Sequence, residues 1–375
     1  MDNTKFYEQV TAQLREGKAD EAIAELEQWL VDHENDEIGM SLYGSALLRA
    51  ERRDEALVVF RKAADTHADS FAAQGDLGFA LAEAGAEGAT QAFRRAVELN
   101  DRFYPGWVFL SRLYHADGDL EAARDAMQKS ERCDPFTDEF RRSQQAMSES
   151  RFADAEKVCR GLLNRQPGYP PAAYTLAHLA SQVGALEEAS RILRQAIVRY
   201  PVDVHLHSAL VVSQEEAGDY EGALETARQL VELQPGVSTA WLILGRVHGH
   251  CGNYEECLET YDKALKLARD NVAELGNTEL LRGHVLKILG RYDEGIAAYR
   301  ASANMVPGNG AAWWSLADMK TFRFEDDDIE AMMIIADDES VKAEQRTQAA
   351  FALGKAHEDR QEFDTAFEWY ARGNG

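Results

Sequence analysis

The sequence has few of the features that mark secreted, membrane or nucleic-acid-binding proteins. It contains four cysteines in 375 residues, too few for a disulfide framework and as expected in a reducing compartment. Its N-terminal residues lack the apolar core of a signal peptide, and no apolar run approaches the roughly 20 residues needed to cross a bilayer. The sequence has 40 basic residues (Lys and Arg) against 65 acidic ones (Asp and Glu), and this negative balance disfavours binding to nucleic acid or to an anionic membrane. We therefore expect a soluble cytoplasmic protein with no nucleic-acid or membrane partner.

Catalytic and cofactor motifs are also missing. The sequence contains no phosphate-binding P-loop, no Gly-x-Ser-x-Gly elbow, no His-Glu-x-x-His and no Gly-x-Gly-x-x-Gly. It therefore predicts no catalytic residue and no cofactor, so the chain is not expected to be an enzyme.

Two clusters contain residue types that bind metals. His248, His250, Cys251 and Cys257 lie close together, and zinc prefers such ligands. The acidic run 325–328 offers carboxylates but lacks the spaced ligand loop of a calcium site, and acidic residues are favoured at a helix N-terminus anyway. We predict no metal site, because packing positions in the repeat described below explain His248 and Cys257, and zinc binding remains the alternative.

What the sequence does have is a repeat with a period near 34 residues. Four glycines are spaced 34, 34 and 38 residues apart, at Gly184, Gly218, Gly252 and Gly290. Prolines follow at intervals of 32, 34, 34 and then 72, at Pro135, Pro167, Pro201, Pro235 and Pro307. The last interval in each series is four residues longer than a 34-residue period predicts, 38 instead of 34 for glycine and 72 instead of 68 for proline. This shared excess places a four-residue insertion near 272–275.

The segment 238–271 shows the unit most clearly. Trp241, Leu244 and Gly245 share one helical face, and Tyr261 lies on a second helix after the turn. A small residue such as Gly245 lets two antiparallel helices approach closely. Because one pair cannot bury its own apolar face, it must stack on copies of itself. The sequence therefore predicts an all-α array of antiparallel helix pairs.

The predicted domains follow from this period. Residues 1–309 hold about nine repeats, which we expect to begin at Asn3, Glu37, Phe71, Tyr104, Phe136, Pro170, Val204, Ser238 and Gly276. The repeat at Phe136 is degenerate, because Glu139 and Ser143 replace its aromatic residue and glycine. Residues 310–346 form an atypical repeat, with a first helix expected over 310–321 and an interruption at 322–324. Residues 347–375 form a final, incomplete repeat.

These residues resemble the tetratricopeptide repeat family over nearly the whole chain. The resemblance implies a right-handed superhelical solenoid whose first helices line a concave, peptide-binding groove. The lysine–asparagine clamp of chaperone-binding members is not visible at Tyr7, Thr11, Ser41 and Ser45, so a chaperone co-factor role is disfavoured.

The C-terminal segment resembles the last repeats of bacterial tetratricopeptide–sulfotransferase fusion proteins. The resemblance rests on 314–320 with Phe322 and Phe324, and on 351–356 with Phe363 and Tyr370. In that family a sulfotransferase domain follows such a segment. The loop with which that domain binds the sulfate donor is missing from the 375 residues of this sequence. The chain is therefore expected to be the repeat half of a larger protein. The alternatives are a substrate-selecting or dimerising arm of a sulfotransferase, or a self-associating scaffold.

First-helix positions 2, 5, 9 and 12 or 13 of each repeat share one face, which we expect to line the groove. The predicted groove residues are Arg112, His115, Gln144, Tyr174, His178, His205, Arg246, His250, His284, Lys287 and Trp314. They outnumber the acidic residues at such positions and predict a protein or peptide ligand bearing acidic and aromatic groups. The alternative is that they pair with neighbours in adjacent repeats. Trp314 follows Trp313, and both cannot point inward.

Overall fold

The computed structural model describes residues 3–269, 271–306, 308–319 and 321–374, which form twenty-two helices and no strand. The predicted all-α class of paired helices is therefore confirmed. Pro307 and Gly375, used above as repeat marker and end of the final repeat, lie outside these residues. The chain divides into two compact units, residues 1–206 and 207–375. Over the same ranges, no helix has both the length and the apolar character that a membrane crossing requires.

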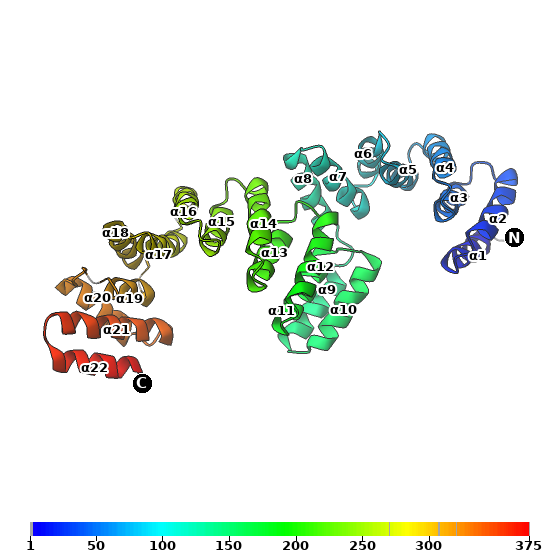
Figure 1. Ribbon diagram of the computed structural model, residues 1–375. Helices are drawn as coiled ribbons and strands as arrows, with labels where there is room; N and C mark the ends of the chain where they lie inside the picture. The colour runs from blue at the N-terminus through cyan, green and yellow to red at the C-terminus, as the bar shows by residue number, and fades with distance from the viewer. Residues whose placement is uncertain (1–2, 270, 307, 320, 375) are drawn as a thin grey trace. The chain divides into compact units, whose positions relative to one another are not determined.

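The first unit contains twelve complete helices in its described residues, drawn from blue to green in Figure 1. They are α1 (Asn3–Arg15), α2 (Ala19–Asp32), α3 (Glu37–Arg49), α4 (Arg53–Thr66), α5 (Phe71–Ala84), α6 (Ala89–Leu99), α7 (Tyr104–Ala116), α8 (Leu120–Arg132), α9 (Thr137–Ser148), α10 (Phe152–Arg165), α11 (Pro170–Gln182) and α12 (Leu186–Arg199).

The second unit begins within α13 and runs to the last described residues. Its helices are α13 (Val204–Glu216), α14 (Tyr220–Leu233), α15 (Ser238–His250), α16 (Tyr254–Ala268), α17 (Val272–Ile288), α18 (Tyr292–Met305), α19 (Gly310–Ala317), α20 (Asp326–Asp337), α21 (Ala343–Asp359) and α22 (Phe363–Asn374).

The first helix of nearly every repeat begins where the period predicts it. The exceptions are α9, which begins one residue later at Thr137, and α17, which begins at Val272 instead of Gly276. Helix α17 has 17 residues, whereas α15 has 13. The four inserted residues therefore extend α17 by about one turn and do not form a loop.

Close packing within a pair depends on a glycine in the first helix. A Cβ atom at Gly245 would lie 2.5 Å from the ring of Tyr261 in the second helix. The same distance separates a Cβ at Gly283 from the ring of Tyr299. Because both rings are at least 97% buried, neither can move aside, and the predicted role of Gly245 is confirmed.

The degenerate repeat replaces this glycine–aromatic contact with a polar pair. Ser143 on α9 lies with its Oγ 3.1 Å from Sγ of Cys159 on α10, and both side chains are fully buried. The repeat therefore keeps its helix pair with a smaller and more polar core.

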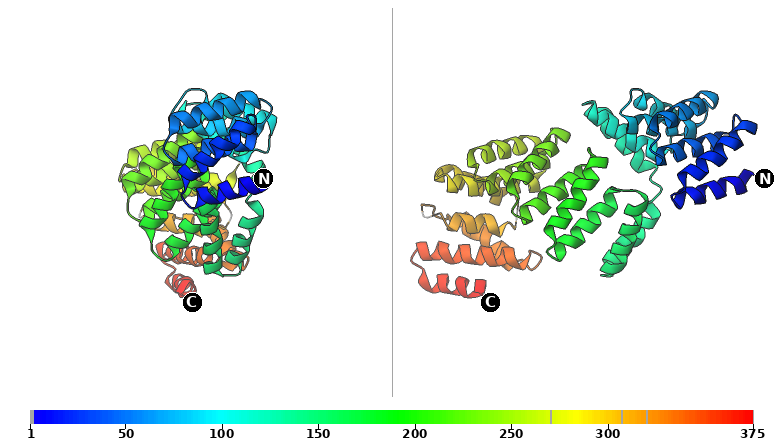
Figure 2. Two further views of the ribbon diagram at one scale, coloured as in Figure 1. Left: turned by 90° about the vertical axis from the view of Figure 1, so that its right-hand side faces the viewer. Right: turned by 45° about the vertical axis from the view of Figure 1, so that its right-hand side comes forward.

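Helices of the first unit pack on their neighbours in two runs, α1 to α8 and α9 to α12. Figures 1 and 2 show α9 to α12 grouped apart from α1 to α8. A buried contact joins the runs: the hydroxyl oxygens of Tyr104 on α7 and Tyr200 after α12 lie 3.0 Å apart. Gln166 also donates to the Tyr200 hydroxyl at 2.8 Å. Thus the fourth repeat contacts the sixth directly, whereas a regular array has contacts only between adjacent repeats.

The C-terminal helices form a layered arrangement around α21. Figure 1 shows α19 and α20 on one side of α21 and α22 on the other, in agreement with their packing. The first helix predicted over 310–321 is too long, because α19 ends at Ala317. Beyond it, Met319 and Phe324 turn into the core beside Trp313, which an extended helix would prevent. The acidic run begins α20, where the Asp328 carboxylate accepts the Glu325 backbone N–H at 3.0 Å.

Candidate functional site

All the predicted groove residues lie on first helices, but they divide between the two units. The first unit contains Arg112, His115, Gln144, Tyr174, His178 and His205, and the second contains Arg246, His250, His284, Lys287 and Trp314.

Helix α11 presents the clearest exposed stripe. Tyr174 is 51% exposed, and His178 lies one turn further along, with its Nε2 3.1 Å from Nε2 of Gln182. The opposite face of the helix is buried through Ala173 and Leu176. Since residues four apart are neighbours on a helix surface, the exposed side chains form one continuous polar and aromatic strip.

The other groove candidates of the first unit differ in their solvent exposure and in their contacts with neighbouring side chains. The Arg112 guanidinium lies 4.9 Å from the centre of the Phe109 ring, and burial, together with nearby Arg199, lowers the pKa of Arg112. Its side chain is therefore partly committed to packing. Gln144 and His205 are exposed, and His115 is half-buried.

In the second unit several candidates are engaged across adjacent repeats. The Glu215 carboxylate lies 2.6 Å from a guanidinium nitrogen of Arg246 and 3.1 Å from Nδ1 of His250. Lys287 pairs in the same way with Asp318. The alternative interpretation, pairing between neighbouring repeats, therefore holds for Arg246, His250 and Lys287, and Arg246 and Lys287 offer less free positive charge than the sequence predicts.

Two further second-unit candidates lie near aromatic rings. Nδ1 of His284 is 2.9 Å from the hydroxyl of Tyr299. Trp313 is 4% exposed and Trp314 is 43% exposed, so the prediction that the two point in different directions is confirmed. The Trp314 ring lies 5.5 Å from that of Phe351.

Glu215, on first helix α13, is the shared acidic partner of Arg246 and His250. It is only 9% exposed, and burial raises its pKa above the ordinary 4.5, against the opposing effect of Arg246 and His250. Its folded state therefore holds a proton more tightly than the unfolded chain does. The ionised carboxylate costs stability above the raised pKa, and this cost disappears as the pH falls below 4.5.

Replacing Arg246 by alanine is expected to lower the free energy of unfolding by about 1–2 kcal/mol at pH 7, because it leaves a buried carboxylate with one partner. The loss should shrink as the pH approaches 5, since protonated Glu215 needs no cation. Urea unfolding at both pH values measures this. Arg291→Ala, which removes an exposed pair with Glu294, is the control, and an equal loss at both pH values for Arg246→Ala would contradict the account.

The four residues of the zinc alternative have separate surroundings. Cys257 is fully buried, and burial raises the pKa of its thiol to about 11, which disfavours the thiolate that zinc requires. Cys251 directs its Sγ to the backbone oxygen of Tyr220 at 3.6 Å. Across the described ranges, no group of three or more His, Cys, Asp or Glu side chains is placed to hold a metal.

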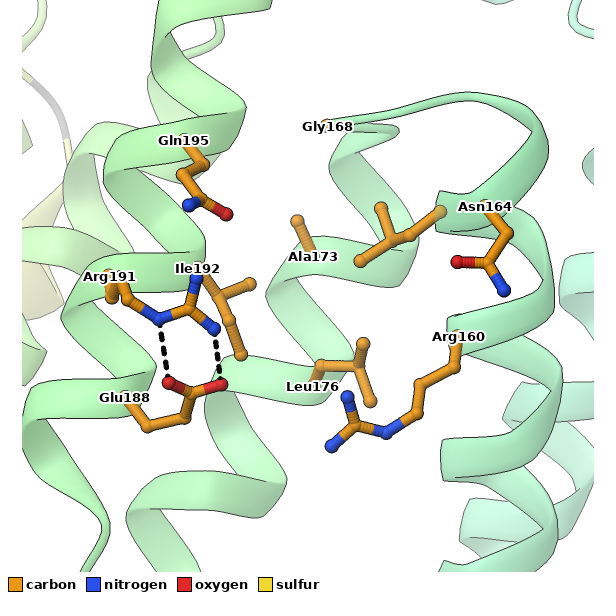
Figure 3. A pocket seen from close by; sticks show the side chains of 10 residues that line it. Arg160, Asn164, Gly168, Ala173, Leu176, Glu188, Arg191, Ile192 and Gln195 are labelled. Atoms are coloured by element: carbon orange, nitrogen blue, oxygen red, sulfur yellow. Dashed lines mark hydrogen bonds and ion pairs between the residues drawn. The ribbon is translucent and has the colours of Figure 1, made fainter. Parts of the chain in front are cut away.

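Sequence reasoning missed a groove on the second helices, because it considered only the first helices. Figure 3 shows this groove between α10 and α12, above the start of α11. Its cavity volume is about 250 Å³. Apolar side chains form the floor and polar ones the sides, from Arg160, Leu163, Asn164, Gly168, Ala173, Leu176, Glu188, Arg191, Ile192 and Gln195. Local charge marks the segment but not the groove: residues 152–199 carry six basic and four acidic residues, in contrast with the chain's net −25.

Three profiles described as tetratricopeptide repeat match residues 106–129, 146–211 and 208–272. A fourth, described as bacterial transcriptional activator domain, matches residues 4–77. Residues 106–129 and 146–272 therefore consist of tetratricopeptide repeats, as the 34-residue period predicts. These matches do not extend to a sulfotransferase.

Two curated relatives are human proteins. The chain is 22% identical to protein O-mannosyl-transferase TMTC1 of Homo sapiens over 145 residues, which is 39% of this chain and 16% of that protein. It is 26% identical to general transcription factor 3C polypeptide 3 of Homo sapiens over 157 residues, 41% of this chain and 17% of that protein. The chain thus spans about a sixth of each relative.

Solved structures of MamA are also similar. A MamA fragment from Desulfovibrio magneticus RS-1 aligns with a TM-score of 0.40 and 14% identity, covering 44% of this chain and 92% of that one. Another MamA crystal structure aligns with a TM-score of 0.34 and 17% identity, and the alignment covers 52% of this chain and 91% of the MamA chain.

Proposed function

We propose that this chain is a non-catalytic, cytoplasmic scaffold whose tetratricopeptide repeats bind a protein partner through the exposed face of their first helices. The ligand is an extended or helical peptide with acidic and aromatic groups. The observation that carries this proposal is the α11 stripe, where Tyr174 and His178 are exposed above a buried face. An aromatic ring and an imidazole one turn apart suit contact with a peptide's aromatic and acidic side chains.

Peptides selected from a display library against the full chain provide the test. We expect Tyr174→Ala with His178→Ala to weaken the selected peptide about tenfold or more in isothermal titration, because both contacts are removed. Tyr292→Ala is the matched control, since Tyr292 is 52% exposed on second helix α18. Unchanged affinity in the double variant would place the ligand elsewhere.

A second candidate is an arm that selects substrates for, or dimerises, a bacterial sulfotransferase. Trp314 and Phe351 favour it, because both belong to the segments that resemble such fusions and their rings lie 5.5 Å apart. Light scattering over a concentration series separates monomer from homodimer. Co-purification with a sulfotransferase that is lost on Trp314→Ala would support this candidate, whereas a monomer without such a partner would exclude it.

A further inference from the structure

Two amide side chains face each other across the groove between α10 and α12. Asn164 extends from α10 and Gln195 from α12, and Figure 3 shows both directed toward the open centre. Neither amide makes a hydrogen bond to the described part of the chain. An amide both donates and accepts, so this pair matches the alternating N–H and C=O groups of an extended peptide backbone.

Arg160 supplies a positive charge at the same place. Its Nε donates to Glu156 at 2.8 Å, which fixes the side chain, and Figure 3 shows its terminal nitrogens turned toward the groove. On the opposite wall, both guanidinium contacts of Arg191 go to Glu188. Arg160 is ion-paired with Glu156 through Nε alone, so its two terminal nitrogens can meet a ligand carboxylate in two-point contact.

An equivalent groove elsewhere in the first unit has the opposite character. It lies between second helices α2 and α4, above α3, with a cavity of about 470 Å³. Glu27, Glu34 and Lys62 supply its charged groups, and Lys62 lies 3.8 Å from Glu34. The segment 19–66 that forms it carries twelve acidic and five basic residues, a net −7, whereas the equally long segment 152–199 is +2. The same architecture therefore occurs once in acidic and once in basic form.

We propose that the groove between α10 and α12 binds an extended acidic peptide of a partner protein. Asn164 and Gln195 hold its backbone, Arg160 binds a carboxylate, and Leu176 with Ile192 receives an apolar side chain. The cavity is smaller than the roughly 300–1,000 Å³ typical of small-molecule sites, as fits a short stretch of chain. This surface lies mainly on second helices and uses the side of α11 that carries Ala173 and Leu176, so it is separate from the exposed first-helix face of Tyr174 proposed above.

Fluorescence anisotropy of the full chain with a rhodamine-labelled heptapeptide of alternating glutamate and leucine tests the assignment. We expect Arg160→Glu to weaken binding at least about tenfold, because it replaces a charge-assisted contact with repulsion. Asn164→Ala with Gln195→Ala should weaken it several-fold. A lysine–leucine peptide of the same length should not bind the groove.

The matched control is Lys62→Glu, which makes the same charge change in the equivalent groove and should leave binding unchanged. Equal weakening by Lys62→Glu and Arg160→Glu would mean that only overall charge matters, and would overturn the assignment. Weakening by Arg246→Glu alone would place the acidic peptide on the first helices, which supports the proposed function and overturns this site. Pyrophosphate that binds at Arg160 more tightly than the peptide would identify an anion site and overturn it as well.

Discussion

Tyr200→Ala is expected to lower the free energy of unfolding of the first unit by about 3–5 kcal/mol, as for other buried aromatic residues cut to alanine. Tyr200 is 1% exposed, and its hydroxyl contacts Tyr104 and Gln166. The change therefore removes a large side chain and a buried hydrogen-bonded bridge between α1–α8 and α9–α12. Thermal unfolding followed by circular dichroism measures the loss of stability.

Hydrogen exchange distinguishes this bridge from an ordinary core contact. In Tyr200→Ala, amides in α9 to α12 should exchange much faster than those in α1 to α6, because the two runs open separately. Tyr200→Phe keeps the ring and should cost only about 1–2 kcal/mol, for the unpaired partners it leaves. Exchange that accelerates uniformly across α1 to α12 would show that the bridge does not couple the two runs.

Gly245→Ala is expected to destabilise the second unit by about 2–3 kcal/mol, although alanine is normally the better helix former. The new Cβ would lie 2.5 Å from the Tyr261 ring, and that ring is only 3% exposed. The two helices must therefore separate or the ring must leave its preferred rotamer. Urea unfolding followed by tryptophan fluorescence reports the change, because Trp241 lies on the same helix.

Gly161→Ala is the matched control for this prediction. Gly161 lies inside α10, and a Cβ there would meet no atom within 4 Å. This change should leave stability unaltered or raise it by up to about 1 kcal/mol. In addition, Tyr261→Leu should recover part of the loss when combined with Gly245→Ala. A Gly245→Ala variant as stable as the parent would show that the helices already have room to separate.

The local fold was predictable because its signals are local. The glycine at 245 and the aromatic at 261 recur 38 residues later at 283 and 299, and in a repeat of this type a pair of antiparallel helices brings such residues together. The end of α19 was predicted wrongly, since the burial of Met319 and Phe324 against Trp313 is a tertiary effect that overrides the helical pattern.

The contacts between distant repeats were beyond sequence reasoning. Tyr104 and Tyr200 are 96 residues apart, and neither departs from the repeat pattern in a way that indicates its partner. The ion pairs of the first helices were more accessible, because Glu215 and Arg246, like Lys287 and Asp318, are 31 residues apart and face each other once one repeat stacks on the next. The groove between α10 and α12 required knowing that consecutive second helices leave a gap.

The lengths of α17 and α21 have a consequence for how such arrays change during evolution. Each has 17 residues, whereas α15 has 13. Four added residues rotate a helix by about 400°, or one turn plus about 40°, so every downstream side chain keeps nearly its original direction. Two added residues would rotate it by about 200° and turn Gly283 away from Tyr299. Insertions of a single turn at the starts of these helices are therefore compatible with the packing that follows, whereas two-residue insertions at the same sites should be eliminated by selection.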